Sequence, residues 1–349
     1  IKVLDFSIAL TGPYAAALLA DQGAEVIKVE RPGIGDIARY VGVMVNGMSA
    51  LYLVCNRGKR SIALDLQQPE GLDIARRLAA EVDVVVENFR PGVMDRLGIG
   101  YDAVRADNPD VVYASLSGFG DVGPYRDRSA YDTVMQAYGG VAANQADPDD
   151  GVPTFLRQTV ADKVTALFAT QAITAALFAR AQGRGGQHVK LSMADAVVSF
   201  LWADAAGNEV MLDADGSQAS SFVAGFQPMA FLDGWGIVTP TSDHDFAGMC
   251  KALEVEGWDD PRIATVGERV KNRDVLAPIM DMAYALAANL TMEEATVRFE
   301  RERVPISMIL TPDQLTRDPP AVAMGMFEEA DHHVVGRTRM PRHPAQFGE

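Results

Sequence analysis

Two short and almost uninterrupted apolar runs constrain the fold of this chain more than any other feature. Val82–Glu87 reads VDVVVE and Val111–Leu116 reads VVYASL. Apolar runs that do not alternate with polar residues are typical of parallel strands covered by helices on both faces. Four more candidate strands are Lys2–Phe6, Ala24–Glu30, Ser61–Asp65 and His188–Met193, and helical patterns separate them at Pro13–Asp21, Pro69–Glu81 and Lys163–Ala181. The alternation predicts an α/β fold with a doubly wound, Rossmann-like large domain.

The texture of the sequence changes after about residue 204. A length of 349 residues favours roughly two domains. We expect residues 1–204 to form the large domain, 205–320 a smaller α+β domain, and 321–349 a return segment toward the large domain. Within the smaller domain, Phe231–Pro240 is typical of a short hairpin around Asp233-Gly234, and residues 274–288 and 291–303 are expected to be helical.

Charge and cysteine usage exclude several classes of protein. The 47 acidic and 31 basic residues give a net charge of −16, which argues against nucleic acid or an anionic membrane as partner. Cys55 and Cys250 are the only cysteines, which excludes a disulfide scaffold and favours the reducing cytoplasm. The first residues resemble a strand more than a secretory leader. The longest apolar run, Val164–Ala179, is short for a bilayer and is expected to be a buried core helix.

Nucleotide and metal motifs are missing from the sequence. The turn after the first strand reads Ala9-Leu10-Thr11-Gly12-Pro13 and lacks the G-x-G-x-x-G fingerprint, although Glu30 closes the second strand as a ribose-binding acid would. No phosphate-binding P-loop and no G-x-S-x-G nucleophile motif occurs. The five histidines show no metal-ligand spacing. We therefore expect neither NAD nor a metal.

Basic residues cluster beside the predicted strand ends. Arg31 follows the second strand, and Arg90 and Arg96 flank Pro91-Gly92 after Val82–Glu87. Ligands of open α/β sheets lie beyond the carboxyl ends of the strands, so these arginines are well placed for an anion. A second group, Arg57, Lys59 and Arg60, precedes the third strand. The alternative for each residue is a solvated or ion-paired surface side chain.

Asp162 stands at the start of the long apolar helix. The ordinary interpretation is an N-cap that accepts hydrogen bonds from the first-turn amides. The functional interpretation is a carboxylate nucleophile kept ionised by the helix dipole, beside amides that stabilise an oxyanion. Spacing in the sequence does not choose between the two.

Ordered segments along nearly the whole chain resemble the family III CoA-transferases, the CaiB/BaiF family that includes formyl-CoA transferase. The matching segments are Val3–Phe6 with Gly12-Pro13, Leu19–Glu30, Asn56–Ile62, Glu87–Gly92, Gly183–Gln187, Ser192–Ala196, Asp233–Trp235, Val304-Pro305 and Asp318-Pro319. The resemblance implies an enzyme that moves CoA from an acyl-CoA to a small carboxylic acid. It also implies an interlocked homodimer in the cytoplasm, with CoA or acyl-CoA as substrate and no metal or NAD.

The same resemblance assigns roles to individual residues. Asp162 is the expected nucleophile, which forms first an aspartyl anhydride and then an aspartyl-CoA thioester, with Tyr131 and Asp132 in support. The expected CoA-binding positions are Arg31, Leu64, Asn88, Phe89, Arg90 and Arg96. Several positions differ from formyl-CoA transferase, which favours different or bulkier acids; these are Leu10, Val41, Gln67 and Ser129.

Two alternatives remain open. The family also contains α-methylacyl-CoA racemases, which move a proton with a histidine and an aspartate. Here the histidine position matches Tyr131, so one of the two acid–base groups is missing. A non-catalytic CoA-binding protein is the other alternative.

Overall fold

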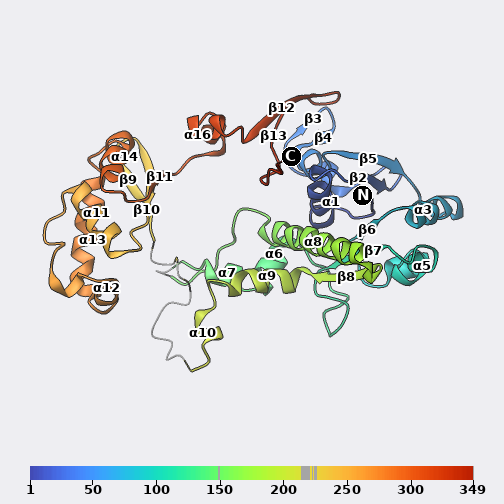
Figure 1. Ribbon diagram of the computed structural model, residues 1–349, viewed down its shortest axis with the longest axis horizontal. Helices are drawn as coiled ribbons and strands as arrows, with labels where there is room; N and C mark the ends of the chain where they lie inside the picture. The colour runs from blue at the N-terminus through green and yellow to red at the C-terminus, as the bar shows by residue number, and fades with distance from the viewer. Residues whose placement is uncertain (148–149, 214–220, 222, 224–225, 349) are drawn as a thin grey trace. The chain divides into compact units, whose positions relative to one another are not determined.

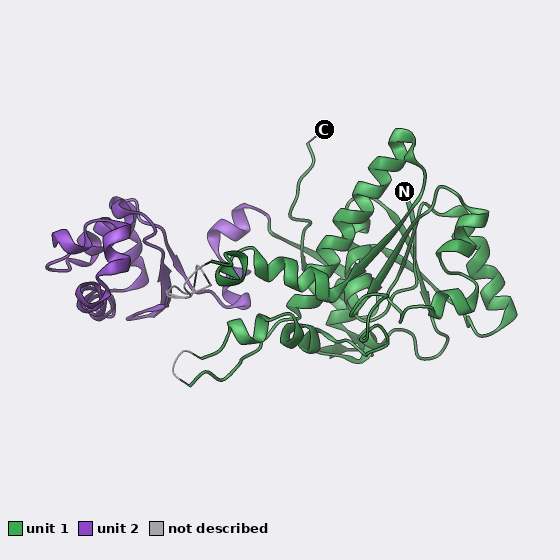
Figure 2. Cartoon of the chain, turned by 90° about the horizontal axis from the view of Figure 1, so that it is seen from below, with its two compact units in different colours: residues 1–221, 326–349 green, residues 222–325 purple. Residues whose placement is uncertain are grey.

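The computed structural model describes residues 1–147, 150–213, 221, 223 and 226–348. The chain forms two compact units, residues 1–221 with 326–349 and residues 222–325 (Figure 2). The sequence pattern placed these boundaries at 205 and 320. Residues 326–349 belong to the same unit as residues 1–221.

A six-stranded, wholly parallel sheet forms the centre of the first unit (Figure 1). Its strands are β1 (Lys2–Asp5), β2 (Glu25–Glu30), β5 (Lys59–Ala63), β6 (Val84–Glu87), β7 (Val112–Ser117) and β8 (Gln187–Ser192). Their spatial order is β5-β2-β1-β6-β7-β8. The predicted α/β class with a parallel sheet is confirmed.

The strand order reverses direction between β1 and β6. The chain runs outward from β1 through β2 to β5, then returns to β6 and runs the other way to β8. The segments that follow β1 and β6 therefore diverge to opposite faces of the sheet. Such a switch point is where ligands of open α/β sheets bind.

Helices cover both faces of the sheet, which explains the unbroken valine run. Val84 and Val86 pack under α1 (Thr11–Asp21) and α8 (Val160–Ala179), whereas Val85 faces the opposite core. All three valines are fully buried. The opposite core is closed by α3 (Pro69–Glu81), α4 (Val93–Leu97) and α5 (Tyr101–Asp107).

Shorter elements complete the first unit. They are the 3-10 turn Ile37–Tyr40, the hairpin of β3 (Met44–Val45) and β4 (Met48–Ser49), α2 (Ala50–Cys55), α6 (Asp132–Tyr138), α7 (Val141–Asn144), α9 (Met193–Trp202), α10 (Gly207–Val210), and the hairpin of β12 (Phe327–His332) and β13 (Gly336–Pro341).

Helix α8 is longer than the apolar pattern indicates. It begins at Val160, three residues before the predicted start, and a π turn, Arg180–Arg184, follows it. By length and composition alone, Val160–Arg184 is long and apolar enough to cross a membrane. Its buried residues include Ala166, Ala169 and Ile173, which pack against the valines of the sheet. This packing is that of a core helix in a globular unit.

Strand β5 also differs from its prediction, since it begins at Lys59 and not at Ser61. Lys59 and Arg60 pair with Val26 and Ile27 of β2. Adjacent charged residues are typical of loops, but here each has a carboxylate partner, Asp5 and Glu25 respectively. Contacts distant in sequence thus extend the strand.

The second unit has its own small antiparallel sheet in the order β11-β10-β9. The expected hairpin is present as β9 (Met229–Phe231) and β10 (Gly234–Val238), and β11 (Ile306–Met308) completes the sheet. Helices pack against it around a core that includes Phe246, Leu253 and Phe299. These and the other helical elements are α11 (Asp243–Leu253), the 3-10 turn Pro261–Ile263, α12 (Val266–Lys271), α13 (Arg273–Ala287), α14 (Met292–Arg301), α15 (Pro312–Leu315) and α16 (Pro319–Ala323).

Candidate active site

Asp162 occupies the third position of α8, and the N-cap of that helix is Thr159. The interpretation of Asp162 as N-cap is therefore wrong by three residues, because the helix begins earlier than its apolar pattern. The carboxylate accepts a hydrogen bond from the hydroxyl of Thr11, the first residue of α1. Among the described residues, no hydrogen bond to its second oxygen, Oδ2, is present.

A carboxylate from another helix accepts a hydrogen bond from the first turn of α8. Asp132, the first residue of α6, accepts a hydrogen bond from the backbone amide of Asp162 at 3.1 Å through Oδ1. Its Oδ2 accepts one from Gln136 Nε2 at 2.6 Å. Asp132 is 7% exposed. It therefore satisfies an amide of α8 that has no helical partner, and it brings a second negative charge close to Asp162.

Burial raises the pKa of Asp162 to about 6, from an ordinary value of 3.8. The hydrogen bond from Thr11 opposes this shift, and the charge of Asp132 adds to it. Desolvation and a neighbouring anion are thus the effects that raise this pKa, and a contribution of the helix dipole stays a prediction. The carboxyl is still mostly ionised at neutral pH, and a raised pKa makes the anion a better nucleophile.

The contact of Thr11 with Asp162 is not indicated by the sequence. Thr11 lies 151 residues from Asp162, and its side chain is buried. The neighbouring Gly12 has a packing role, since a Cβ there would lie 2.3 Å from Ser7 Cβ. No local pattern marks a threonine whose partner comes from a distant helix.

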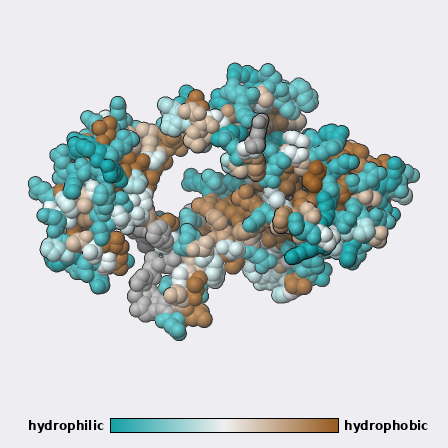
Figure 3. All heavy atoms as spheres, in the orientation of Figure 1, coloured by the Kyte–Doolittle hydropathy of each residue, from teal (hydrophilic) through white to brown (hydrophobic). Residues whose placement is uncertain are grey.

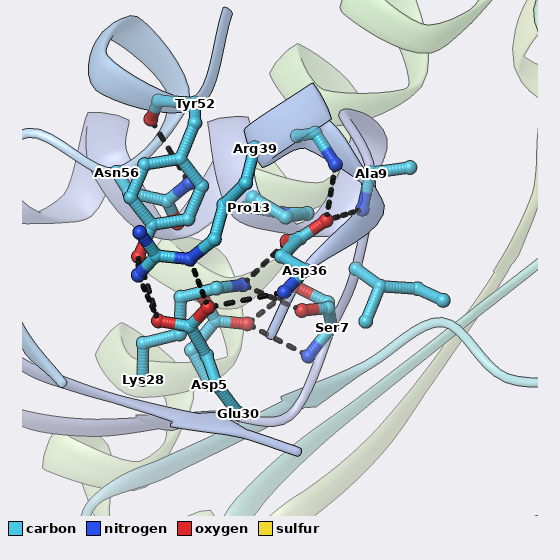
Figure 4. Close-up of polar contacts among 12 residues, drawn as sticks. Asp5, Ser7, Ala9, Pro13, Lys28, Glu30, Asp36, Arg39, Tyr52 and Asn56 are labelled. Carbon is cyan, nitrogen blue, oxygen red and sulfur yellow. Dashed lines mark hydrogen bonds and ion pairs between the residues drawn. The ribbon is translucent and has the colours of Figure 1, made fainter. Parts of the chain in front are cut away.

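A buried polar network holds the turn between β1 and α1 (Figure 4). Lys59 Nζ donates to Asp5 Oδ2 at 2.8 Å and to the carbonyl of Pro13 at 2.7 Å. Lys28 Nζ lies 2.9 Å from Asp36 Oδ2 and donates to the carbonyl of Ser7 at 2.7 Å. Both lysine ammonium groups are thus paired with a buried carboxylate and with a backbone carbonyl.

Glu30 accepts hydrogen bonds from side chains of the protein, so its carboxylate is not free to bind a ribose. Arg39 donates to both of its oxygens, and Tyr52 and Ser61 donate to Oε1, at distances of 2.7 to 2.8 Å. These hydrogen bonds lower the pKa of Glu30 to about 2 despite the burial that opposes them. The carboxylate at the end of β2 closes the sheet edge onto the 3-10 turn that contains Arg39.

The predicted CoA-binding residues lie after three strands of the same sheet edge. Arg31 follows β2, Leu64 follows β5, and Asn88 with Phe89 follows β6. Asn88 bonds both the amide and the carbonyl of Ile8 at 2.8 Å, which ties together the segments after β1 and β6 at the switch point. Leu64 is buried in the core, so its side chain is a packing residue.

A cavity of about 490 Å³ opens beside the carboxyl ends of β6, β7 and β8. Phe89 and Arg90 line it, together with Glu87, Ser115 and Lys190. Arg90 also donates to Ser129 Oγ at 2.6 Å, so it connects the segment after β6 to the segment before α6. Asp162 is partly exposed but is not among the described residues that line this cavity.

Comparisons with known proteins agree on one family. The model of CoA-transferase family III matches residues 1–349. The chain belongs to CoA-transferase family III. It is 32% identical to the succinyl-CoA:glutarate CoA-transferase of Mus musculus, over 98% of this chain and 78% of that protein. It is 34% identical to the acetyl-CoA:oxalate CoA-transferase of Acetobacter aceti, over 80% of this chain and 73% of that protein.

A solved structure gives the same assignment for the fold. The structure of a CaiB/BaiF family protein from Brucella suis covers 100% of this chain, which covers 92% of that one, with a TM-score of 0.84 and 32% identity. The resemblance seen in the sequence is confirmed, and the protein is a CoA-transferase.

Each residue of the basic cluster at the start of β5 has an acidic partner in this CoA-transferase. Arg57 pairs with Asp21, Lys59 with Asp5 and Arg60 with Glu25. Arg57 and Arg60 are ion-paired, as the ordinary interpretation has it, whereas Lys59 is a buried ion pair and not a surface side chain. Arg31 and Arg96 are exposed at the sheet edge and on α4, where the anion hypothesis still applies to them.

The remaining candidate groups are Tyr131, His188 and possible metal ligands. Tyr131 is the N-cap of α6, and its side chain is 73% exposed. His188, on β8, stacks on Tyr101, and its Nε2 lies 2.9 Å from Ser115 Oγ. Within the described residues, no group of three or more His, Cys, Asp or Glu side chains could hold a metal.

Proposed function

We propose that this transferase moves CoA between an acyl-CoA and a carboxylic acid with Asp162 as covalent nucleophile. The observation that carries the proposal is the position of Asp162. Its carboxylate is partly buried and has no cationic partner in the described part of the chain, its pKa is raised to about 6, and one oxygen accepts a hydrogen bond from Thr11. A nucleophile needs an oxygen with a free lone pair, and Oδ2 of Asp162 accepts no hydrogen bond from the described residues.

The first half of the reaction transfers the acyl group. Asp162 Oδ2 attacks the thioester carbonyl, the C–S bond breaks, and CoA thiolate leaves an aspartyl–acyl anhydride. The thiolate then attacks the aspartyl carbonyl. The bond from that carbonyl to the bridging oxygen breaks, which releases the first acid and leaves an aspartyl-CoA thioester.

The second half repeats these steps in reverse with a new acid. An incoming carboxylate attacks the aspartyl-CoA carbonyl and displaces the thiolate, and the thiolate attacks the new acyl group and regenerates Asp162. No step needs a general base, because every nucleophile is already an anion. Exclusion of water is essential, because an exposed anhydride hydrolyses.

Replacement of Asp162 by asparagine tests the proposal. We expect D162N to lose exchange of labelled acid into acyl-CoA by at least about 10³-fold, with CoA binding retained. Mass spectrometry after hydroxylamine treatment should find a hydroxamate at residue 162 of the wild type only. Asp245 offers a matched control, since it is also the third residue of a helix, α11, and D245N should keep full exchange. Full exchange by D162N would refute the mechanism.

The substrates to test first come from the names of the relatives. One relative is named for succinyl-CoA and glutarate, another for acetyl-CoA and oxalate. We propose that acids bulkier than oxalate are accepted, since Val41 stands where formyl-CoA transferase has a tryptophan. A panel of acyl-CoA donors against these carboxylates, read by mass spectrometry, identifies the pair.

We further propose that the active form is an interlocked homodimer. Helices α6, α8 and α9 pack against one another, and apolar side chains gather over this region of the first unit (Figure 3). The exposed ones include Val134, Leu167, Phe178, Phe200 and Trp202. An apolar face of this kind marks an interaction surface. Light scattering should give twice the chain mass; a monomer would refute this part.

The cytoplasm is our proposed location. Cys55 and Cys250 are both buried free thiols, which suits a reducing compartment. Fractionation of cells that express the protein tests this point.

A further inference from the structure

The hydroxyl of Thr11 occupies one oxygen of Asp162 and leaves the other available. Thr11 Oγ1 donates to Asp162 Oδ1, and Thr11 is only 4% exposed. The hydrogen bond lowers the pKa of Asp162 against the effect of burial, so it stabilises negative charge on that oxygen. The two oxygens of this carboxylate are therefore not equivalent.

Hydrogen bonds fix the backbone of Ile8 and Ala9, shortly before Thr11 in the chain. Ala9 has a positive φ of 66°, which is strained for a residue other than glycine. Its amide donates to Asp36 Oδ1 at 2.8 Å, and Asn88 holds Ile8 through two hydrogen bonds. The structure around the turn thus compensates the strain, as in binding and catalytic sites.

Two buried ion pairs lie beneath this turn (Figure 4). Lys28 and Asp36 form one pair, and Lys28 also holds the carbonyl of Ser7. Lys59 and Asp5 form the other, and Asp5 Oδ1 accepts from the backbone amide of Ser7 at 2.9 Å. The donor on Thr11 is consequently preorganised, since its backbone cannot move without breaking buried charge pairs.

We propose that Thr11 is a catalytic residue that stabilises the oxyanion formed on Asp162 itself. This inference rests on the proposed function and adds a role that the nucleophile alone does not supply. Two steps of the proposed cycle attack the aspartyl carbonyl, one by CoA thiolate on the anhydride and one by the incoming acid on the thioester. Both steps place a negative charge on Oδ1, the oxygen that faces Thr11.

The electron balance of the first of these steps is simple. The thiolate sulfur forms a bond to Cγ, and the π electrons of the carbonyl move to Oδ1, where the Thr11 hydroxyl donates to the new anion. The electrons then return, the bond from Cγ to the bridging oxygen breaks, and the first acid leaves as its carboxylate. No proton is transferred, so the hydroxyl acts only as a donor.

The test compares T11V, T11S and a matched control. Valine keeps the shape of threonine and removes the donor, and serine restores the donor. Thr170 is a buried threonine at the same contact between α1 and α8, where its hydroxyl donates to the carbonyl of Ala166 at 2.9 Å. T170V removes a hydroxyl of the same kind away from Asp162.

We expect T11V to lower kcat about 10²–10³-fold, as loss of one oxyanion donor does, with KM for acyl-CoA within about threefold of wild type. T11S should recover most of the activity, and T170V should stay near wild type. Rapid acid quench and intact mass should show that T11V accumulates the aspartyl–acyl adduct, because conversion to aspartyl-CoA is the slowed step.

Three results would overturn the assignment. One is T11V with kcat within about threefold of wild type, and another is a slow T11V that accumulates unmodified enzyme. The third is a T11S variant as slow as T11V. If T11V does not fold, T11A is measured in the same way. The proposed function fails separately, namely if D162N still forms either adduct.

Discussion

Two pairs of buried carboxylates near one edge of the sheet behave in opposite ways. Asp5 and Glu30 have cationic partners, Lys59 and Arg39, and their pKa values are lowered in spite of desolvation. Asp162 accepts from a hydroxyl and Glu87 from a backbone amide, neither has a cationic partner within the described residues, and burial raises their pKa values to about 6 and about 7. Within these two pairs, a cationic partner accompanies a lowered pKa, and its absence accompanies a raised one.

The largest expected effect follows from removal of a cation. K59M leaves Asp5 buried without its partner and should lower the free energy of unfolding by about 3–5 kcal/mol. Urea denaturation at neutral pH measures it. The double variant K59M/D5N should lose less than K59M alone, because no uncompensated charge remains. Equal loss in both variants would break the comparison.

Glu87 offers the converse experiment. Its pKa is about 7 in the folded protein against 4.5 for the ordinary side chain, so the folded state binds its proton more tightly. Its contribution to stability is complete below pH 4.5 and is lost as pH rises to about 7. E87Q should thus unfold with about 1–3 kcal/mol more free energy than wild type at pH 8, and with little difference at pH 4.5. A loss of stability at pH 8 would contradict the assignment.

Asp162 predicts a pH dependence of activity. In the proposed function the ionised form of Asp162 is the nucleophile, so kcat/KM should fall about tenfold between pH 7 and pH 5, with a limb near pH 6. T11V should move that limb to higher pH, because the hydrogen bond that lowers the pKa is gone. The control T170V should keep the limb in place. An acidic limb near pH 4 in the wild type would show that burial does not govern this carboxyl.

The smallest effect is expected at the opposite end of β2. Glu25 pairs with Arg60, and both side chains are largely exposed. R60Q should change the free energy of unfolding by about 0.5 kcal/mol or less, because water screens the pair. Urea denaturation in parallel with K59M shows the contrast directly, since the two residues are neighbours on one strand. An effect comparable to that of K59M would mean that burial is not the deciding factor.

The parallel sheet and its helices could be predicted from the sequence because they depend on local patterns. Val84, Val85 and Val86 face two different cores, so all three must be apolar, and the sequence shows it. The helix Pro69–Glu81 has the predicted bounds because proline marks its first turn.

The partners of the site could not be predicted, since they depend on contacts distant in the sequence. Lys28 lies inside a strand, and the residues next to it in the sequence do not indicate that Asp36 and the carbonyl of Ser7 are its partners. Asp162 was found through its place before a long helix, but its donor Thr11 belongs to another helix. The start of α8 was misplaced because Asp132, from α6, supplies the acceptor for its first turn.

The hydrogen bond between Thr11 and Asp162 makes the two otherwise equivalent oxygens of that carboxylate exchange differently during turnover. Under the proposed scheme, the oxygen that faces Thr11 remains in the protein for its whole lifetime. Its twin departs with the first acid at each turnover and is replaced by an atom from the second. An enzyme cycled in ¹⁸O-labelled acid would therefore carry the isotope on only one side of a group that is symmetric in water.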